Sequence, residues 1–481
     1  MVCFFGQLAA KEQPLRPKRG HGWPQTIKLF NQGGKTIMAM VVKNNMSAVN
    51  TLNTLNRNSS ALAKSLQKVS SGMKINGAAD DASGYAISER MRVQIRGLDQ
   101  ANANTQNGSS MMKVAEGAVS STVEILKTLK EKVINSANDT NTDSDRQQIQ
   151  KELNQSVDQI DDNANVTYNG KYLVDGSHNN KVTATCTALT NESLFSSTVG
   201  GSALTDLQTR TGEKLNIHST DNITVSFVKQ GRTYTTTYSV GSASTLDSVM
   251  TGLSSAMNGT EVASTVGSMS ITGTNSYIGL DTAGNSVFTA DNGRALTITS
   301  KGSGTDYQIS GFTISISNNQ GAINKSANAA LDNFTESIRA QNQSDDNAIV
   351  LQVGTKANQA IKVGMTDMRS TALGLKGTDG SVLNVSTQVK SNAAITVLDN
   401  ALQKALDQQT TIGSVESRLE YTSSNLTTAS ENVQASESTI RDADMAKEMT
   451  NYTKNNVLLQ AAQSMLAQAN QSSSSVLSLL Q

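Results

Sequence analysis

Hydrophobic positions near both ends of the chain recur in alternating steps of four and three residues. The first row consists of Ala48, Leu52, Leu55, Ser59, Leu62, Leu66, Val69 and Met73. A second row consists of Met112, Ala115, Val119, Thr122, Leu126, Leu129 and Val133. A third consists of Ile412, Val415, Leu419, Thr422, Leu426, Ala429, Val433, Ser436 and Ile440. This spacing predicts long helices, each with a coiled-coil seam.

The seams are narrow, and each is interrupted by serine, threonine or alanine. Two interpretations are open at this point. The helices could form an ordinary bundle that buries its seams within one chain. Alternatively, they could complete their burial only against neighbouring molecules, which the small and polar interruptions favour.

The middle of the chain has a different pattern, with period two and a composition rich in Thr, Ser, Gly and Asn. Residues 223–227 alternate, Gln230 and Gly231 form a turn signal, and residues 234–240 alternate again, which predicts a β-hairpin. Further strands are expected at 296–299 and 312–316, around Cys186, and in a hairpin at 348–364. The chain is therefore predicted to be mainly α with a β-rich insert, and its N- and C-terminal helices pair into a long coiled-coil-like bundle.

Composition narrows the function classes. Aromatic residues make up 4% of the chain and charged residues 17%, which suits thin helical bundles better than a large aromatic core. The net charge of zero predicts neither nucleic acid nor an acidic lipid surface as a partner. Because no run of about 18 apolar residues occurs, no membrane insertion is expected.

Residues 1–37 differ from the rest of the sequence. This prefix holds six basic residues against one acidic residue, together with all three prolines and the single tryptophan. It lacks the apolar stretch of a secretory signal, so a targeting role is the weaker interpretation. Gln32, Gly33 and Gly34 can be encoded by a bacterial ribosome-binding sequence. We therefore expect translation to start at Met38, with residues 1–37 a miscalled upstream leader.

No pattern of catalytic, cofactor-binding or metal-ligating residues is present. His21, His178 and His218 are isolated, and no HExxH motif occurs. Cys186 has no second cysteine or histidine beside it, and no GxSxG turn is found. The glycines near residue 303 lack the lysine of a phosphate-binding loop. The sequence predicts a protein that is not an enzyme and uses no cofactor.

Both helical ends carry extended motifs that resemble those of bacterial flagellin, the subunit of the flagellar filament. The N-terminal motif starts at Met38 and reads MAMVVKNNMSAVNTLNTLNRNSSALAKSLQKVSSGMKINGAADDASGYAISERM. The C-terminal motif reads ESTIRDADMAKEMTNYTKNNVLLQAAQSMLAQANQSSSSVLSLLQ. The resemblance implies a structural subunit that self-assembles, is secreted, and lies in the extracellular flagellum.

The resemblance also implies a division of the chain. An N-terminal inner-core helix and spoke would span 38–84, and the N-terminal helical part of the outer core 85–178. The hypervariable surface insert would span 179–321. The C-terminal part of the outer core, including the hairpin at 348–364, would span 322–438, and the C-terminal inner-core helix 439–481.

In flagellins the two terminal segments are disordered in the free subunit and become paired helices on assembly, which is coupled folding and binding. The resemblance therefore implies a set of polymerisation residues: Leu52, Leu55, Leu62, Leu66, Leu459, Met465, Leu466, Val476, Leu477, Leu479 and Leu480. It also implies a flagellin export chaperone on the C-terminal segment, and filament cap and hook-associated proteins as further partners. Within the spoke, Asp80 and Asp81 are expected to cap a helix rather than to bind metal.

Many flagellins activate a host Toll-like receptor through a helix reading Gln-Arg-x-Arg-Glu-Leu. Aligned through the shared Ser-Ala-Asn at 136–138, Thr128 replaces the first arginine of that motif and Lys132 replaces its leucine. Lys130 replaces the second arginine, whereas Glu131 and Glu152 match acidic positions. The substitutions imply weakened receptor binding, because threonine cannot supply the hydrogen bonds of a guanidinium.

Two other functions compete with that of a filament subunit. A hook–filament junction protein shares the helical ends, but the complete N-terminal motif and the long insert favour flagellin. A secreted adhesin or immune ligand with a helical stalk would not grow long filaments after seeding.

Overall fold

The computed structural model describes residues 45–195, 198, 201–241, 244–246, 248–249, 270–272, 277–281, 284–288, 295–300 and 302–478. The predicted leader at 1–37 lies outside the described residues, as do Leu479 and Leu480. The described chain is helical toward both ends and β-rich in the middle, so the predicted fold class is confirmed.

Long helices lie toward both ends of the described chain: α1 (Met46–Ser71), α2 (Ala82–Ser136), α3 (Asp143–Ala164), α6 (Gln388–Arg441) and α7 (Met445–Ser478). A short helix, α5 (Lys325–Leu331), lies between strands of the β-rich region. The chain forms two compact units, and each is described separately below. The terminal unit comprises Met1–Gly72 and Ala443–Gln481, and the main unit comprises Met73–Asp442.

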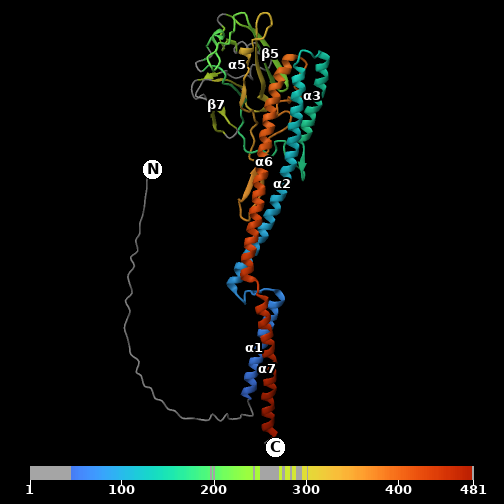
Figure 1. Cartoon of the computed structure of the whole chain (residues 1–481), viewed down its shortest axis with the longest axis vertical. Helices are drawn as coiled ribbons and strands as arrows, with labels where there is room; N and C mark the ends of the chain where they lie inside the picture. Colours follow the sequence, from blue (N-terminus) through green and yellow to red (C-terminus); the bar gives the residue numbers. More distant parts are fainter. Residues whose placement is uncertain are drawn as a thin grey trace, which may run out of the picture. The chain divides into compact units, whose positions relative to one another are not determined.

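The helical part of the main unit is built from α2, α3 and α6. Helix α2 lies against both α6 and α3 (Figure 1). The predicted second seam is buried, and Leu126 and Val133 have no exposed surface. On α6 the third seam is buried at Ile412 and Leu419 but only half-buried at Leu426 and Val433. The first interpretation is therefore confirmed for the buried part of this helix pair, whereas burial against neighbouring molecules stays a prediction for the half-buried part.

Short antiparallel sheets make up the rest of the main unit. Their orders are β10–β4–β5, β11–β3–β9–β6, β1–β2, β7–β8 and β12–β13. The strands are β1 (Thr167–Tyr168), β2 (Lys171–Tyr172), β3 (Ala188–Asn191), β4 (Asn222–Lys229), β5 (Arg232–Ser239), β6 (Ser270–Thr272), β7 (Tyr277–Leu280), β8 (Ser286–Phe288), β9 (Ala295–Thr299), β10 (Ile309–Ser317), β11 (Thr335–Ile338), β12 (Ile349–Gln352) and β13 (Ala360–Val363). Two short 3-10 helices, Leu204–Asp206 and Thr305–Tyr307, lie between strands.

The predicted central hairpin is confirmed. Strands β4 and β5 pair with Lys229 opposite Arg232, which leaves Gln230 and Gly231 as a two-residue turn. Both turn residues have positive φ, as a turn matching the strand twist requires. A side chain at Gly231 would collide with the carbonyl oxygen of Ser381, 2.5 Å away. The expected strands near 296–299, 312–316 and 348–364 are also present, whereas Cys186 lies just before β3 and not within a strand.

A second hydrophobic core lies within the β-rich region. Phe227 of β4 and Phe312 of β10 are fully buried there, and Leu331 of α5 joins them. Helix α5 also closes the outer edge of β10, because Asn328 and Asp332 accept hydrogen bonds from backbone N–H groups of that strand. Strand β11, in turn, pairs with β3. Helix α5, which follows the expected boundary at residue 321, thus contributes Ala327, Ala330 and Leu331 to this core.

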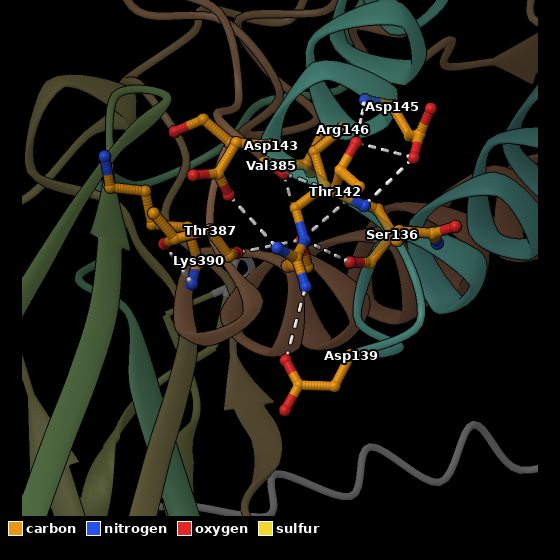
Figure 2. A network of polar contacts seen from close by, with 12 residues as sticks. Ser136, Asp139, Thr142, Asp143, Asp145, Arg146, Val385, Thr387 and Lys390 are labelled. Carbon is orange, nitrogen blue, oxygen red and sulfur yellow. Dashed lines mark hydrogen bonds and ion pairs between the residues drawn. The ribbon is translucent and has the colours of Figure 1, made fainter.

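The turn between α2 and α3 is organised by a buried arginine, Arg146 (Figure 2). Its Nε donates to the Ser136 carbonyl at 3.0 Å and its Nη2 to the Asn138 carbonyl at 3.1 Å, both at the C-terminal end of α2. Asp143 accepts from Nη1 at 3.2 Å. The cation thereby supplies a donor to the Ser136 carbonyl at the helix end, and a second donor to the Asn138 carbonyl, which also accepts from Asn141 N.

The Arg146→Met variant should destabilise the main unit by roughly 1–3 kcal/mol, because the buried Ser136 carbonyl loses its donor and the exposed Asn138 carbonyl loses one of two. Urea unfolding followed by circular dichroism measures the change. Arg90→Met, which alters an exposed arginine of α2, is the control and should have little effect. Equal stability of the two variants would contradict this role of Arg146.

A buried acidic side chain joins the β-rich region to α6. Glu336 of β11 is 7% exposed, and Arg339 Nε lies 3.2 Å from its Oε2 atom. Arg339 also reaches Asp407 of α6, with 2.6 Å between Nη1 and Oδ2. Burial raises the pKa of Glu336 to about 7, despite the opposing effects of Arg339 and Lys404. Ionisation of this carboxyl near neutral pH therefore opposes folding.

The main unit should lose stability as the pH rises from 5 to 8. The pKa of Glu336 is raised in the folded state, so its contribution is complete below about 4.5 and is lost as the pH passes about 7. The loss amounts to roughly 3 kcal/mol at most. Urea unfolding at several pH values should show a flatter profile for Glu336→Gln. The exposed control Glu213→Gln should keep the wild-type profile, and identical profiles for all three proteins would refute the assignment.

Candidate functional site

The terminal unit holds most of the predicted polymerisation residues, on a pair of helices that we call the terminal helix pair, α1 with α7 (Figure 1). Helix α1 begins at a cap in which the Asn45 side chain accepts from Ala48 N. It ends at Gly72, whose φ of 72° favours glycine. The paired helical arrangement that the sequence predicts for assembly is therefore the one that this structure has.

The contact between α1 and α7 is narrow and made by small residues. Ser65 and Ala462 are the buried residues among those described in this unit, and Asn455 Nδ2 donates to Ser65 Oγ at 3.2 Å. Asn58 donates to the Leu458 carbonyl at 3.3 Å, and Asn45 donates to the Ala469 carbonyl at 3.1 Å. Rising numbers on α1 meet falling numbers on α7, so the helices are antiparallel. Amide side chains bonded to backbone carbonyls set their register.

One row of the α1 seam faces α7, and the other does not. Leu55 and Leu62 are half-buried, together with Ala48 and Val69 of the same heptad row. Leu52 and Leu66, which belong to the neighbouring row, are 45% and 52% exposed. Helix α7 covers the row of Leu55 and Leu62 together with a different adjacent row, which contains Asn58 and Ser65. The predicted row of Leu52 and Leu66 therefore lies outside the contact with α7 and is open to another molecule.

Helix α7 also presents uncovered apolar side chains. Leu459 and Leu466 are half-buried in the contact with α1, whereas Met465 is 62% exposed. Val476 and Leu477 lie in the last described turn of the helix, but their side chains are outside the described part. Sequence reasoning missed six further exposed residues: Met46, Val49, Met445, Met449, Val457 and Leu458. A helical wheel of both segments could have identified them, because they border the strip that faces the partner helix.

The spoke residues have structural roles. Asp81 caps α2 by accepting from Ser83 N and Gly84 N, both at 3.0 Å, so the capping interpretation is confirmed for this residue. Asp80 accepts from Asn76 N at 3.2 Å. A Cβ atom on Gly84 would lie 2.5 Å from an Asp81 carboxylate oxygen, which explains the glycine at this position.

The candidate receptor-facing residues lie on α2 and α3. Thr128 and Glu131 are exposed, and the Thr128 hydroxyl donates to the Glu124 carbonyl of its own helix. Lys132 Nζ lies 3.1 Å from Glu152 Oε1, which links α2 to α3. Lys130 forms an ion pair with Asp399 of α6. Exposed pairs of this kind contribute little to stability, although each directs a lysine along the surface.

The described part of the chain has neither a metal-binding cluster nor a membrane-spanning helix. No group of three or more His, Cys, Asp and Glu side chains there is placed to hold a metal ion. No helix in that part combines the length and hydropathy that a membrane span requires. His178 contacts the Asn347 carbonyl, and His218 lies beside Asp221. These two histidines therefore have different partners and do not form a common site. His21 lies outside the described residues.

Comparison with known proteins gives matches at both helical ends. Residues 42–179 match the family model described as the bacterial flagellin N-terminal helical region, and residues 395–480 match the bacterial flagellin C-terminal helical region. A flagellin of Clostridium tyrobutyricum is 34% identical over 90% of this chain and 99% of its own length. A flagellin of Bacillus subtilis strain 168 is 30% identical over 92% of this chain and its whole length.

Solved structures are more distant. The crystal structure of the flagellar junction protein FlgL from Legionella pneumophila covers 74% of this chain and 99% of its own, at 15% identity and a TM-score of 0.31. A likeness at that level carries no argument about function.

Proposed function

The chain belongs to the bacterial flagellins, and from this premise we propose how its terminal helix pair builds a filament. The protein is a structural subunit of the flagellar filament, the extracellular part of the flagellum that drives swimming. One observation supports our assignment of the polymerisation surface: the predicted seam row of Leu52 and Leu66 lies outside the contact with α7 and is exposed. A neighbouring copy of the same chain is the partner that would cover it.

The proposed polymerisation surface joins two sets of residues. On α1 it contains Leu52 and Leu66, with Leu55 and Leu62 holding α7 in place. On the C-terminal side it contains Leu459, Met465, Leu466, Val476, Leu477, Leu479 and Leu480. Covering a half-exposed leucine contributes about 1 kcal/mol, so several such residues per subunit provide a substantial driving force. Because each copy offers the same surface, the contact can repeat along a polymer.

Several further properties belong to the same proposal. The subunit is secreted, and before export a flagellin chaperone covers the exposed apolar side chains of its C-terminal segment. Filament cap and hook-associated proteins contact the two ends of the polymer. The predicted lack of catalytic activity fits a structural family. The junction-protein alternative has less support, because the flagellin relatives match at much higher identity over nearly the whole chain.

Changing Leu52 and Leu66 to Asp should prevent filament growth while leaving the monomer folded. Both side chains are already half in water in the single chain, whereas a carboxylate at either position would be desolvated in the polymer. Electron microscopy and sedimentation after seeding measure growth, and circular dichroism checks the monomer. The control is Asn53→Asp with Gln67→Glu, which adds the same charges at adjacent exposed polar positions. Normal filaments from the leucine variant would disprove this surface.

We also propose that this flagellin is a weak ligand of the Toll-like flagellin receptor. Thr128 offers one hydroxyl, already bonded to its own helix, where the activating motif has an arginine. Lys132 places an ammonium group where that motif has leucine. Lys132 also forms an ion pair with Glu152, so this carboxylate is engaged within the subunit and is less available to the receptor. Loss of an anchoring arginine typically weakens an interface by about 2 kcal/mol or more.

The Thr128→Arg, Lys132→Leu double variant should activate receptor-expressing cells at concentrations at least about tenfold lower than the wild type. It restores the guanidinium and releases Glu152. A dose–response with monomeric protein is the measurement. Lys151→Leu, which removes an exposed lysine of α3, should leave the response unchanged. Wild-type activity equal to that of a flagellin with the full motif would show that the proposal is wrong.

A further inference from the structure

Methionines are divided between the two units according to their exposure. Every exposed methionine among the described residues lies on the terminal helix pair: Met46 (62% exposed), Met445 (44%), Met449 (46%) and Met465 (62%). The methionines of the main unit are buried or half-buried: Met73, Met91, Met111, Met112, Met365 and Met368. The four exposed thioethers are therefore open to solvent in the single chain. Met465 belongs to the proposed polymerisation surface, and the other three lie on the same two helices.

We propose that Met46, Met445, Met449 and Met465 are sites of reversible oxidation to methionine sulfoxide by hydrogen peroxide, and that this modification excludes the free subunit from the filament. The proposal rests on the polymerisation surface described above. Oxidation turns a flexible apolar side chain into a polar one. A sulfoxide oxygen on this surface would have to leave water when a neighbouring copy covers it.

The chemistry needs only the thioether and the peroxide. A sulfur lone pair attacks one peroxide oxygen, the O–O bond breaks, and a proton transfer completes one molecule of water. The sulfur is oxidised by two electrons, and the peroxide is reduced by two. Reduction of the sulfoxide by a dithiol, catalysed by methionine sulfoxide reductases, returns the thioether and a second water.

The positions of these methionines limit the effect to assembly. The contact between α1 and α7 uses Leu55, Leu62, Ser65, Leu459 and Ala462, none of which is oxidised by peroxide. An oxidised subunit should thus keep its terminal helix pair. Its outward surface changes instead. Met465 lies one heptad from exposed Leu458, and Met445 and Met449 lie one turn apart, so each sulfoxide would stand on an apolar strip.

Exposure also determines when oxidation can occur relative to assembly. Before assembly the four thioethers are accessible to a small oxidant. Once a neighbouring copy covers them, the same side chains are shielded. Methionine suits a surface that must fit more than one partner, because its unbranched chain adapts to different shapes. The thioether that gives methionine this adaptability is also sensitive to oxidation, whereas a leucine side chain is not.

A partition experiment tests the proposal on the complete chain. Monomer with Cys3→Ser and Cys186→Ser is treated with hydrogen peroxide until it carries on average about one sulfoxide, a level at which single-site effects dominate. Seeds are added, and filaments are separated from unassembled protein. Peptide mass spectrometry then compares sulfoxide at each methionine in the two fractions. Sulfoxide at the four sites should be depleted about tenfold in filaments, which corresponds to about 1.4 kcal/mol per site.

Met73 and Met91, half-buried in the main unit, are internal controls whose sulfoxide should be distributed equally. Methionine sulfoxide reductases of both stereospecificities, with a dithiol, should restore assembly of the oxidised fraction. The variant with leucine at all four positions should assemble after peroxide treatment. Should it fail to assemble untreated, the partition experiment decides alone.

Two results would overturn the proposal. One is equal sulfoxide at the four sites in filaments and in the unassembled fraction. The other is an unchanged critical concentration for fully oxidised monomer. Failure of untreated wild-type protein to assemble on seeds would instead contradict the proposed function, so the two failures are distinguishable.

Discussion

Pairing between the two ends of the chain is the constraint on which the rest of this structure depends. In the main unit, α2 from the N-terminal half lies along α6 from the C-terminal half. Arg441 fixes one end of that pair, with Nη1 2.6 Å from Glu89 Oε1 and the guanidinium over the Tyr85 ring. At the other end the Ser136 hydroxyl of α2 donates to the Val385 carbonyl just before α6. We call the α2–α6 pair the frame. The chain between these two helices starts at one of them and ends at the other.

The frame explains how a β-rich insert can be so unlike the helices that carry it. The insert has its own hydrophobic core, around Phe227 and Phe312, so its stability does not depend on the α2–α6 seam alone. Its links to the frame are both apolar and polar. Val228 of β4 joins the hydrophobic core of the helices, and β10 packs against α6. Two further links are polar. The path from Glu336 through Arg339 to Asp407 is one, and the contact of Gly231 with Ser381 is another. A loop region with these properties can change in sequence without altering the helices.

Burial along the helices decreases from the main unit to the terminal unit. Leu126 and Val133 are completely buried, Leu426 and Val433 are half-buried, and Leu52 and Leu66 are about half exposed. Small polar residues can lie in these seams because their hydroxyls form hydrogen bonds within the helix. The hydroxyls of Thr105 and Thr122, for example, bond to carbonyls of their own helix and leave no unsatisfied group. The helix pairs within one subunit thus leave the proposed polymerisation surface open.

The sequence alone was sufficient to predict elements whose information is local. The four-and-three spacing predicted the helices and the α2 seam, because a helix repeats its faces at that interval. The pattern around Gln230 and Gly231 predicted the hairpin, because its turn needs positive φ at both residues. Long motifs at both ends indicated the family, and with it the function. Residues 1–37, Leu479 and Leu480 were assigned from sequence only.

The tertiary structure decided everything that depends on which surfaces meet. A heptad pattern marks Leu52 and Leu55 alike, and only the placement of α7 shows that one is exposed and the other half-buried. Arg146 has no sequence signal, since its partners are carbonyls of a helix end brought back by a turn. The partner of Lys132 on α3 could not be known either. Such contacts join residues far apart in sequence, and periodicity contains no information about which of them the fold brings together.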